Sequence, residues 1–173
     1  MSGDRFRREL LDERGYRTTG ETTRFFELGF PAPLPAPDAR VREADDVAER
    51  VALLNNVQPH LAIDAIRYER MRSGPGFRQD LDLVADVEGT LAAGVNAWFD
   101  APSRIGVLEP LGCRAAFRRR GLMRAVLGEA LRRLEALGAE RVIVQARAEN
   151  GAACALHASL GFREIARKER WAT

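Results

Sequence analysis

Residues 105–137 read IGVLEPLGCRAAFRRRGLMRAVLGEALRRLEAL, and this stretch decides the expected fold. Residues 105–113 predict a strand, residues 114–121 a basic bend, and a long helix begins at Leu122. Gly138 is a typical C-terminal stop for that helix. The apolar positions recur at helical spacing and form one face: Met123, Val126, Leu127, Ala130, Leu131, Leu134 and Leu137. A strand, a basic turn and a helix therefore follow one another directly.

The basic bend has the chemistry of an anion-binding site. Backbone N–H groups in the first turn of a helix lack partners inside the helix, and the helix dipole adds partial positive charge there. Gly121 lets the backbone approach a ligand without a Cβ in the way. Five arginines crowd the bend: Arg114, Arg118, Arg119, Arg120 and Arg124. The bend predicts a phosphate-binding site, and its alternative is a solvated basic turn.

The strand before the bend contains Pro110, which cannot donate a backbone hydrogen bond to a neighbouring strand. A proline in mid-strand indicates a bulge or a locally unpaired edge. We therefore expect this strand to part from a neighbour near residues 109–112 and to leave backbone groups free for a ligand. Period-two alternation places one set of side chains on a common face: Ile105, Val107, Glu109, Leu111 and Cys113.

The rest of the chain after residue 38 alternates strands and helices. Further strands are expected at 39–44, 81–85, 91–99, 141–146 and 162–171, and helices at 45–54, 61–71 and 151–160. The order is βααβββαβαβ. This pattern predicts an α/β (α+β) fold with a mixed central sheet, helices on both faces and parted central strands.

The hexapeptide Arg118–Met123, RRRGLM, resembles the acetyl-CoA signature of the GNAT superfamily of N-acetyltransferases. It departs from that signature at Met123, where the family has Gly or Ala. Asn150 followed by ALHASLGF, residues 155–162, resembles the family's second signature, with His157 in place of the usual tyrosine. The resemblance covers roughly residues 40–173 and implies the GNAT fold and acetyl-CoA as co-substrate.

The resemblance also implies which residues would bind acetyl-CoA. They are Leu111, Gly112, Cys113, Arg118, Arg119, Arg120, Gly121, Leu122, Met123, Arg124 and Asn150. The first three would offer backbone hydrogen bonds to pantetheine in the manner of an added strand. Cys113 can be read instead as a small apolar filler, and Asn150 as a cap of the helix after it.

Two residues are candidates for catalysis. Glu109 is either a general base for the acceptor amine or an ordinary surface carboxylate. His157 occupies the place of the family's acidic tyrosine and would protonate the departing CoA thiolate. Its alternative is a packed or exposed helix histidine without a part in turnover.

Residues 1–38 are expected to form an N-terminal extension separate from the domain at 39–173. The run PAPLPAP, residues 31–37, predicts a semi-rigid linker. A shift of 146 positions carries Gly15-Tyr16-Arg17 onto Gly161-Phe162-Arg163. The extension therefore resembles the tail of a lost GNAT domain, or else the match is a coincidence. Its apolar strand at 25–30 has no evident cover, so a homodimer is also considered.

Composition narrows the function classes. The chain has 173 residues and a net charge of +2. A charge this small does not indicate the positive electrostatic field typical of nucleic-acid-binding proteins. The two cysteines have no metal or disulfide spacing, and no apolar run has membrane length. We expect a cytoplasmic protein with no metal, no membrane contact and no nucleic-acid partner.

These observations favour an N-acetyltransferase that brings acetyl-CoA and an amine together for direct attack in a ternary complex. The alternatives are an acyl-CoA-binding domain without catalysis and, less favoured, a nucleic-acid-binding module using the arginine cluster. The acceptor, a small-molecule or peptide amine, is not specified by the sequence.

Overall fold

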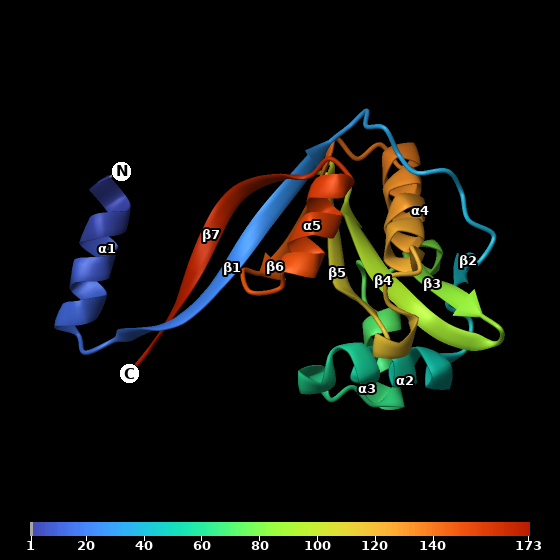
Figure 1. The fold of residues 1–173 in the computed structure, drawn as a ribbon, viewed down its shortest axis with the longest axis horizontal. Helices are drawn as coiled ribbons and strands as arrows, with labels where there is room; N and C mark the ends of the chain where they lie inside the picture. Colours follow the sequence, from blue (N-terminus) through green and yellow to red (C-terminus); the bar gives the residue numbers. More distant parts are fainter. Residues whose placement is uncertain (1) are drawn as a thin grey trace.

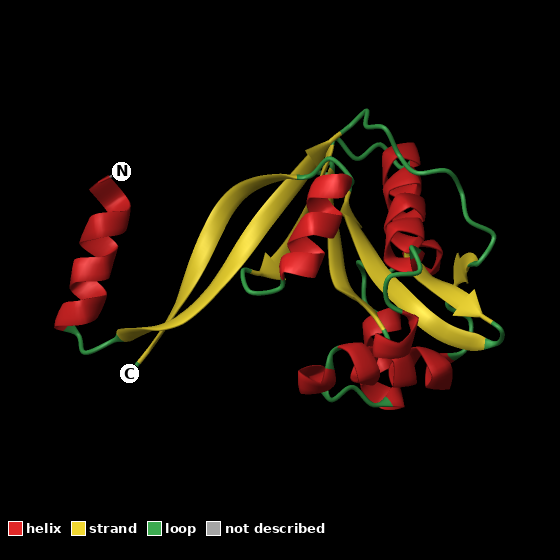
Figure 2. Cartoon of the chain, in the orientation of Figure 1, coloured by secondary structure: helices red, strands yellow, loops and turns green. Residues whose placement is uncertain are grey.

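A seven-stranded mixed sheet in the order β2-β3-β4-β5-β6-β1-β7 forms the centre of the computed structural model. The structure describes the backbone of residues 2–173 and the side chains from residue 5 onward. Its strands are β1 (Arg17–Gly29), β2 (Val41–Glu43), β3 (Asp82–Val87), β4 (Thr90–Asp100), β5 (Ile105–Cys113), β6 (Arg141–Arg147) and β7 (Arg163–Ala172). Its helices are α1 (Ser2–Glu13), α2 (Val47–Val57), α3 (Ala65–Arg72), α4 (Leu122–Ala136) and α5 (Gly151–Ser159) (Figures 1 and 2). The α/β fold predicted from the sequence is confirmed.

The sheet is covered on both faces, as the alternation of its side chains requires. Leu83 and Val95 belong to the larger core cluster, together with Leu127 and Leu131 of α4. Val84, the residue next to Leu83, belongs to a second cluster with residues of α2. The side chains of neighbouring strand residues thus point to opposite faces of the sheet. Helix α4 lies on the other side of the sheet from α2 and α3 (Figure 1).

A buried ion pair fixes α2 and α3 to the sheet. The Arg50 guanidinium lies 2.8 Å from the Asp82 carboxylate, and both side chains are almost fully buried. The Tyr68 hydroxyl of α3 donates a short hydrogen bond to the other Asp82 oxygen. Removing one partner of such a buried group leaves the others unpaired and costs roughly 3–5 kcal/mol. The cluster therefore sets the position of the α2–α3 connection, which borders the site described below.

The strands β5 and β6 part as predicted. They pair in parallel only where residues 105–107 meet residues 141–143. Beyond that point β5 continues along β4 as far as Cys113, while β6 continues along β1 as far as Arg147. The β4–β5 register shifts next to Glu109 and Pro110, so β5 carries a bulge there. A wedge-shaped opening in the sheet is the consequence.

The N-terminal segment differs from the expectation of a separate extension. β1 lies inside the sheet, antiparallel to β6 on one side and to β7 on the other. Its residues Phe26 and Leu28 are buried in the main core. A boundary after residue 38 therefore does not divide the sheet into two units. The apolar strand that appeared uncovered in the sequence is covered by its own chain.

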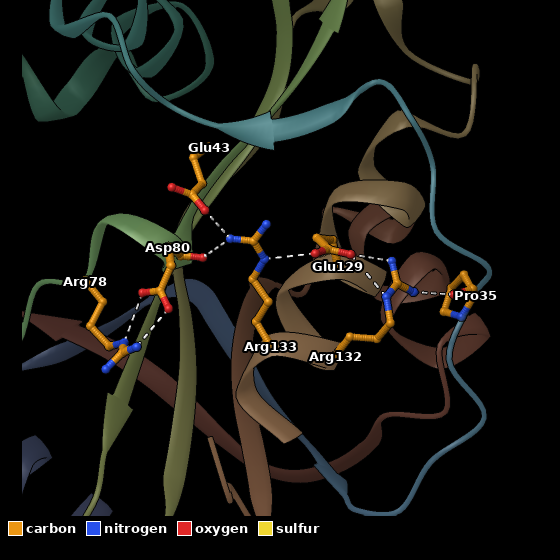
Figure 3. A network of polar contacts seen from close by, with 7 residues as sticks. All are labelled: Pro35, Glu43, Arg78, Asp80, Glu129, Arg132 and Arg133. Atoms are coloured by element: carbon orange, nitrogen blue, oxygen red, sulfur yellow. Dashed lines mark hydrogen bonds and ion pairs between the residues drawn. The ribbon is translucent and has the colours of Figure 1, made fainter. Parts of the chain in front are cut away.

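The proline-rich segment, residues 31–37, runs across α4, and we call it the strap. The Arg132 guanidinium donates to the Pro35 carbonyl, and Glu129 holds both Arg132 and Arg133 (Figure 3). A Cβ added at Gly128 would stand 3.1 Å from the Pro35 side chain, so the strap lies directly on the helix. Arg133 extends the network to Glu43 at 2.7 Å. These contacts hold the strap against α4. The proline-rich segment is therefore packed on the domain and is not a free linker.

The sequence repeat noted above has a structural counterpart. α1, Gly15 and β1 follow one another as α5, Gly161 and β7 do, and both glycines adopt a left-handed φ, 81° and 92°. In the β1–β7 pair, Thr22 faces Glu169 and Thr23 faces Lys168. The shift of 146 positions carries Thr22 onto Lys168 and Thr23 onto Glu169, so an approximate two-fold relates the halves of this ribbon. Its outer part and α1 form an arm that projects from the rest of the molecule (Figure 1).

Candidate active site

A cleft of about 1280 Å³ opens where β5 and β6 part. Its walls come from β5, the basic bend, the start of α4, the end of β6, α5 and the α2–α3 connection. It contains all but one of the residues predicted from the sequence: Glu109, Leu111, Gly112, Cys113, Arg118, Arg119, Gly121, Leu122, Met123, Arg124, Asn150 and His157. The fold thus brings the two sequence signatures to one place.

One end of the cleft is the N-terminus of α4. Gly121 is the N-cap with φ 77°, and no side chain caps the helix. Arg119 also has a positive φ, 62°, which curls the bend around the helix start. The amide of Ala125 is the first to bond within the helix, to the Gly121 carbonyl. The three amides before it are therefore available to an anion, and the helix dipole favours negative charge there.

The arginine side chains of the bend make different contacts. Arg118 donates to the Cys113 carbonyl at 3.3 Å, and Arg124 donates to the carbonyl and hydroxyl of Ser159. The Arg120 guanidinium lies over the Phe117 ring, 5.3 Å from its centroid. Arg118, Arg119 and Arg124 line the cleft, which gives this end a positive field.

At the β5 wall of the cleft, helix α2 packs closely against strand β5. A Cβ on Gly112 would lie 2.7 Å from Cβ of Val57, so only glycine allows α2 to approach β5 this closely. Gln58 donates its side-chain amide to the Leu111 carbonyl at 3.1 Å. Burial raises the pKa of the half-buried Cys113 thiol, which disfavours the thiolate that a nucleophile would need.

Asn150 caps α5 from the opposite wall. Its side-chain oxygen accepts from the Ala153 amide at 3.1 Å, which satisfies one of the free donors of that helix. The residue also lines the cleft. The capping role predicted as the alternative for Asn150 is thus present, and it leaves the side-chain N–H groups free to face a ligand.

Glu109 spans the opening between the parted strands. One of its carboxylate oxygens accepts from the Gln145 amide of β6 at 2.9 Å, and its carbonyl accepts from the Trp98 indole at 2.6 Å. The residue is exposed and lines the cleft. Its position is fixed from both sides while the other carboxylate oxygen stays open to a substrate.

His157 does not fit the role of proton donor. The side chain is 0% exposed, and its ring lies 5.5 Å from the Phe26 ring and 5.8 Å from the Phe162 ring. Both ring nitrogens lack a hydrogen-bond partner among the described residues. Burial lowers the pKa of His157 to about 4, so the ring is neutral at pH 7 and has no imidazolium proton to give. It forms the inner layer of the cleft wall.

The sequence analysis did not identify Gln145, which donates to the Glu109 carboxylate, or the cleft wall formed by the α2–α3 connection. Gln145 lies on the interior strand β6, where its polar side chain among β-branched residues was the available signal. The wall formed by the α2–α3 connection depends on Asn55, whose amide pairs with the backbone of Ile63 at 2.7 and 2.9 Å. No local sequence pattern marks that contact.

The fold is an α/β fold with a parted sheet and an uncapped, glycine-started helix at the open end of the parting. Residues 51–162 match the family model described as the acetyltransferase (GNAT) family, and the chain belongs to that family. A search of curated proteins finds no significant match.

Solved structures of GNAT proteins share the fold. A GCN5-related N-acetyltransferase from Sphaerobacter thermophilus has a TM-score of 0.82 at 19% identity, over 97% of this chain and 57% of that chain. A putative GNAT acetyltransferase from Novosphingobium aromaticivorans has 0.64 at 20% identity, over 88% and 64%. AAC(6')-Iy in complex with the bisubstrate analogue CoA-S-monomethyl-acetylneamine has 0.64 at 17% identity, over 77% and 96%. This chain thus spans less than two thirds of the first two structures.

No group of three or more His, Cys, Asp or Glu side chains suited to a metal ion occurs in the part of the chain that the structure describes. Across the same residues, no helix combines the length and apolarity needed to cross a membrane.

Proposed function

We propose that the chain transfers an acetyl group from acetyl-CoA to a primary amine by direct attack in a ternary complex. The observation that carries this proposal is the parted β5–β6 edge leading to the uncapped N-terminus of α4. Such an edge offers backbone groups to an extended pantetheine, and such a helix start offers amides to a pyrophosphate. AAC(6')-Iy, a structural neighbour, is bound to an analogue that contains CoA.

In this proposal the co-substrate runs the length of the cleft. The pyrophosphate binds the amides of Leu122, Met123 and Arg124, with Arg118 and Arg119 adding charge and Gly121 allowing close approach. The pantetheine follows Leu111, Gly112 and Cys113 on one side and meets Asn150 on the other. Arg120, stacked on Phe117, lies at the margin of this path and contributes only to the field.

The acetyl group then lies near Glu109. The amine nitrogen attacks the thioester carbonyl, the C–S bond breaks, and Glu109 accepts the proton that the amine loses. The Gln145 hydrogen bond holds that carboxylate in place during the transfer. The departing thiolate takes its proton from water, because a thiol of pKa roughly 8.5 is a good leaving group without a dedicated acid. His157 has no proton-transfer role in this scheme.

Charge at position 121 tests the binding site. Gly121→Glu places a carboxylate and a strained φ at the helix start, so acetyl-CoA affinity should fall by roughly tenfold or more. Gly89→Glu is the matched control, since Gly89 has φ 78° and open surroundings like Gly121 but lies in the β3–β4 turn. Isothermal calorimetry measures both. Equal affinities in the two variants would reject the assignment.

The second candidate is a domain that binds acyl-CoA without transferring the acyl group. The observation in its favour is the buried neutral His157 at the position of the family's tyrosine. Free-thiol release with acetyl-CoA and a panel of amines separates the two functions. Calorimetric binding without thiol release for every amine supports the second candidate.

A further inference from the structure

We infer that the acceptor is a primary amine that carries one positive charge on an apolar body, an alkyl or aralkyl monoamine or a peptide N-terminus with an apolar first residue. This inference rests on the proposed function and specifies its acceptor class. It comes from apolar side chains that line the same cleft as Glu109 and from the charges along that cleft.

The wall is apolar without belonging to the core. Leu61, Ile63 and Met71 line the cleft and are only half-buried. None of the three belongs to either hydrophobic core cluster or packs against one. Partly exposed apolar surface that no core requires is a common mark of a ligand site. These three residues form what we call the acceptor wall.

The acceptor wall is held in a fixed shape. Asn55 makes two hydrogen bonds to the backbone of Ile63, at 2.7 and 2.9 Å. Gln58 ties the start of the same connection to Leu111 of β5, the strand that carries Glu109. The distance between the wall and the carboxylate is therefore set by the fold before any ligand binds, which favours selection of a body of defined shape.

The charges along the cleft fit one cation only. Of the residues whose side chains the structure describes, Glu109 is the only carboxylate that lines the cleft, while Arg118, Arg119, Arg124 and Arg147 are cationic. The first three lie at the helix end, and Arg147 lies on β6 two positions after Gln145. One ammonium group can pair with Glu109. A second or third ammonium group would find no further carboxylate among the described residues that line the cleft, and would lie among neutral side chains and arginines, at a cost in desolvation and repulsion.

The test compares alkylamines with one another and peptide amides with one another on the full chain, because an α-amino group has a pKa of roughly 8 and an alkylamine one of roughly 10. Free-thiol release with acetyl-CoA is measured for ethylamine, butylamine, hexylamine, phenethylamine and spermidine, and for the peptide amides Leu-Gly and Lys-Gly. We expect kcat/KM to rise roughly fourfold for each methylene added to the alkyl chain. Spermidine should lie at least about tenfold below hexylamine. A flat alkyl series, or a preference for spermidine, overturns the inference and leaves the proposed function standing.

Variants locate the effect on the acceptor wall. Ile63→Ser and Leu61→Ser should flatten the alkyl series, mainly through KM, with unchanged calorimetric affinity for acetyl-CoA. Ile66→Ser is the matched control, because Ile66 is 66% exposed on α3 and lies outside the cleft. A steep series in Ile63→Ser and Leu61→Ser would contradict the inference. With kcat/KM expressed per unprotonated amine, Leu-Gly amide well above both Lys-Gly amide and the alkylamines identifies a peptide acceptor, and alkylamines above Leu-Gly amide identify a small amine. No thiol release with any amine would reject the proposed function itself, and the inference with it.

Discussion

At the scale of single residues, His157 shows how a sequence position can mislead. Its place in the second signature predicted a proton donor, but the ring is enclosed by Phe26 and Phe162. Phe26 comes from β1, more than a hundred residues earlier in the chain. Because Phe26 comes from a distant strand, no pattern near position 157 could have revealed its part of the enclosure.

The buried His157 predicts a pH dependence of stability. Its pKa in the folded protein is lowered from 6.5 to about 4, so the unfolded chain binds the proton more readily. The favourable contribution is complete above pH 6.5 and is lost as the pH falls toward 4, by an amount on the order of 3 kcal/mol. His157→Phe removes the titration and should lessen the loss of stability between pH 7 and 5, measured by urea unfolding.

The control for this comparison is His60→Phe, since His60 is exposed on the α2–α3 connection. The same His157→Phe protein should keep wild-type acetyl transfer at pH 7, because a neutral buried ring donates no proton. Identical pH dependence in His157→Phe and wild type would show that the ring is not buried neutral in solution.

At the scale of elements, the contact between α2 and β5 predicts the effect of a single methyl group. Gly112→Ala would place its Cβ 2.7 Å from Cβ of Val57 and must push the helix from the strand. We expect a loss of roughly 1–3 kcal/mol in the free energy of unfolding. The cleft wall would move with the helix, so acetyl-CoA affinity should also fall.

The double variant Gly112→Ala/Val57→Ala tests the cause. Trimming Val57 makes room for the new methyl group, so the pair should lose less stability than the two single changes combined. Urea unfolding of the four proteins in the cycle measures the coupling. Strictly additive losses would mean that the two residues do not touch.

The elements differ in how well the sequence specifies them. α4 and β5 are fixed locally, by helical spacing, by Gly121 and by Pro110, and the structure has them where the sequence predicts. The place of β1 between β6 and β7 is not fixed locally. Its residues predict an extended segment, but the choice of neighbours depends on long-range pairing that periodicity does not encode. In the cleft, likewise, the residues proposed to bind acetyl-CoA lie in short local stretches, 111–113 and 118–124 with Asn150, whereas the proposed acceptor wall depends on the fold of the α2–α3 connection.

At the scale of the whole molecule, the position of β1 makes the order of strands depend on the N-terminal segment. β6 and β7 have no pairing with each other among the described strands, since each pairs with β1. The arm beyond the sheet has few ties, such as the 2.8 Å bond from Arg8 to Glu169. The origin of the segment as the tail of another GNAT domain, and a homodimer through it, stay predictions.

Two truncations separate the roles of arm and strand. Deleting residues 1–38 removes β1, exposes the edges of β6 and β7 and uncovers the core around Phe26, so the shortened chain should fail to fold or should aggregate. Deleting residues 1–15 removes α1 and the turn after it, and should leave the free energy of unfolding within about 1 kcal/mol of wild type, because α1 lies at the tip of the arm. Far-UV circular dichroism, size-exclusion chromatography and acetyl-CoA calorimetry on both proteins decide the matter. If the chain lacking residues 1–38 is folded, monodisperse and binds acetyl-CoA, the sheet does not need β1. If the chain lacking residues 1–15 unfolds, the arm itself contributes to stability.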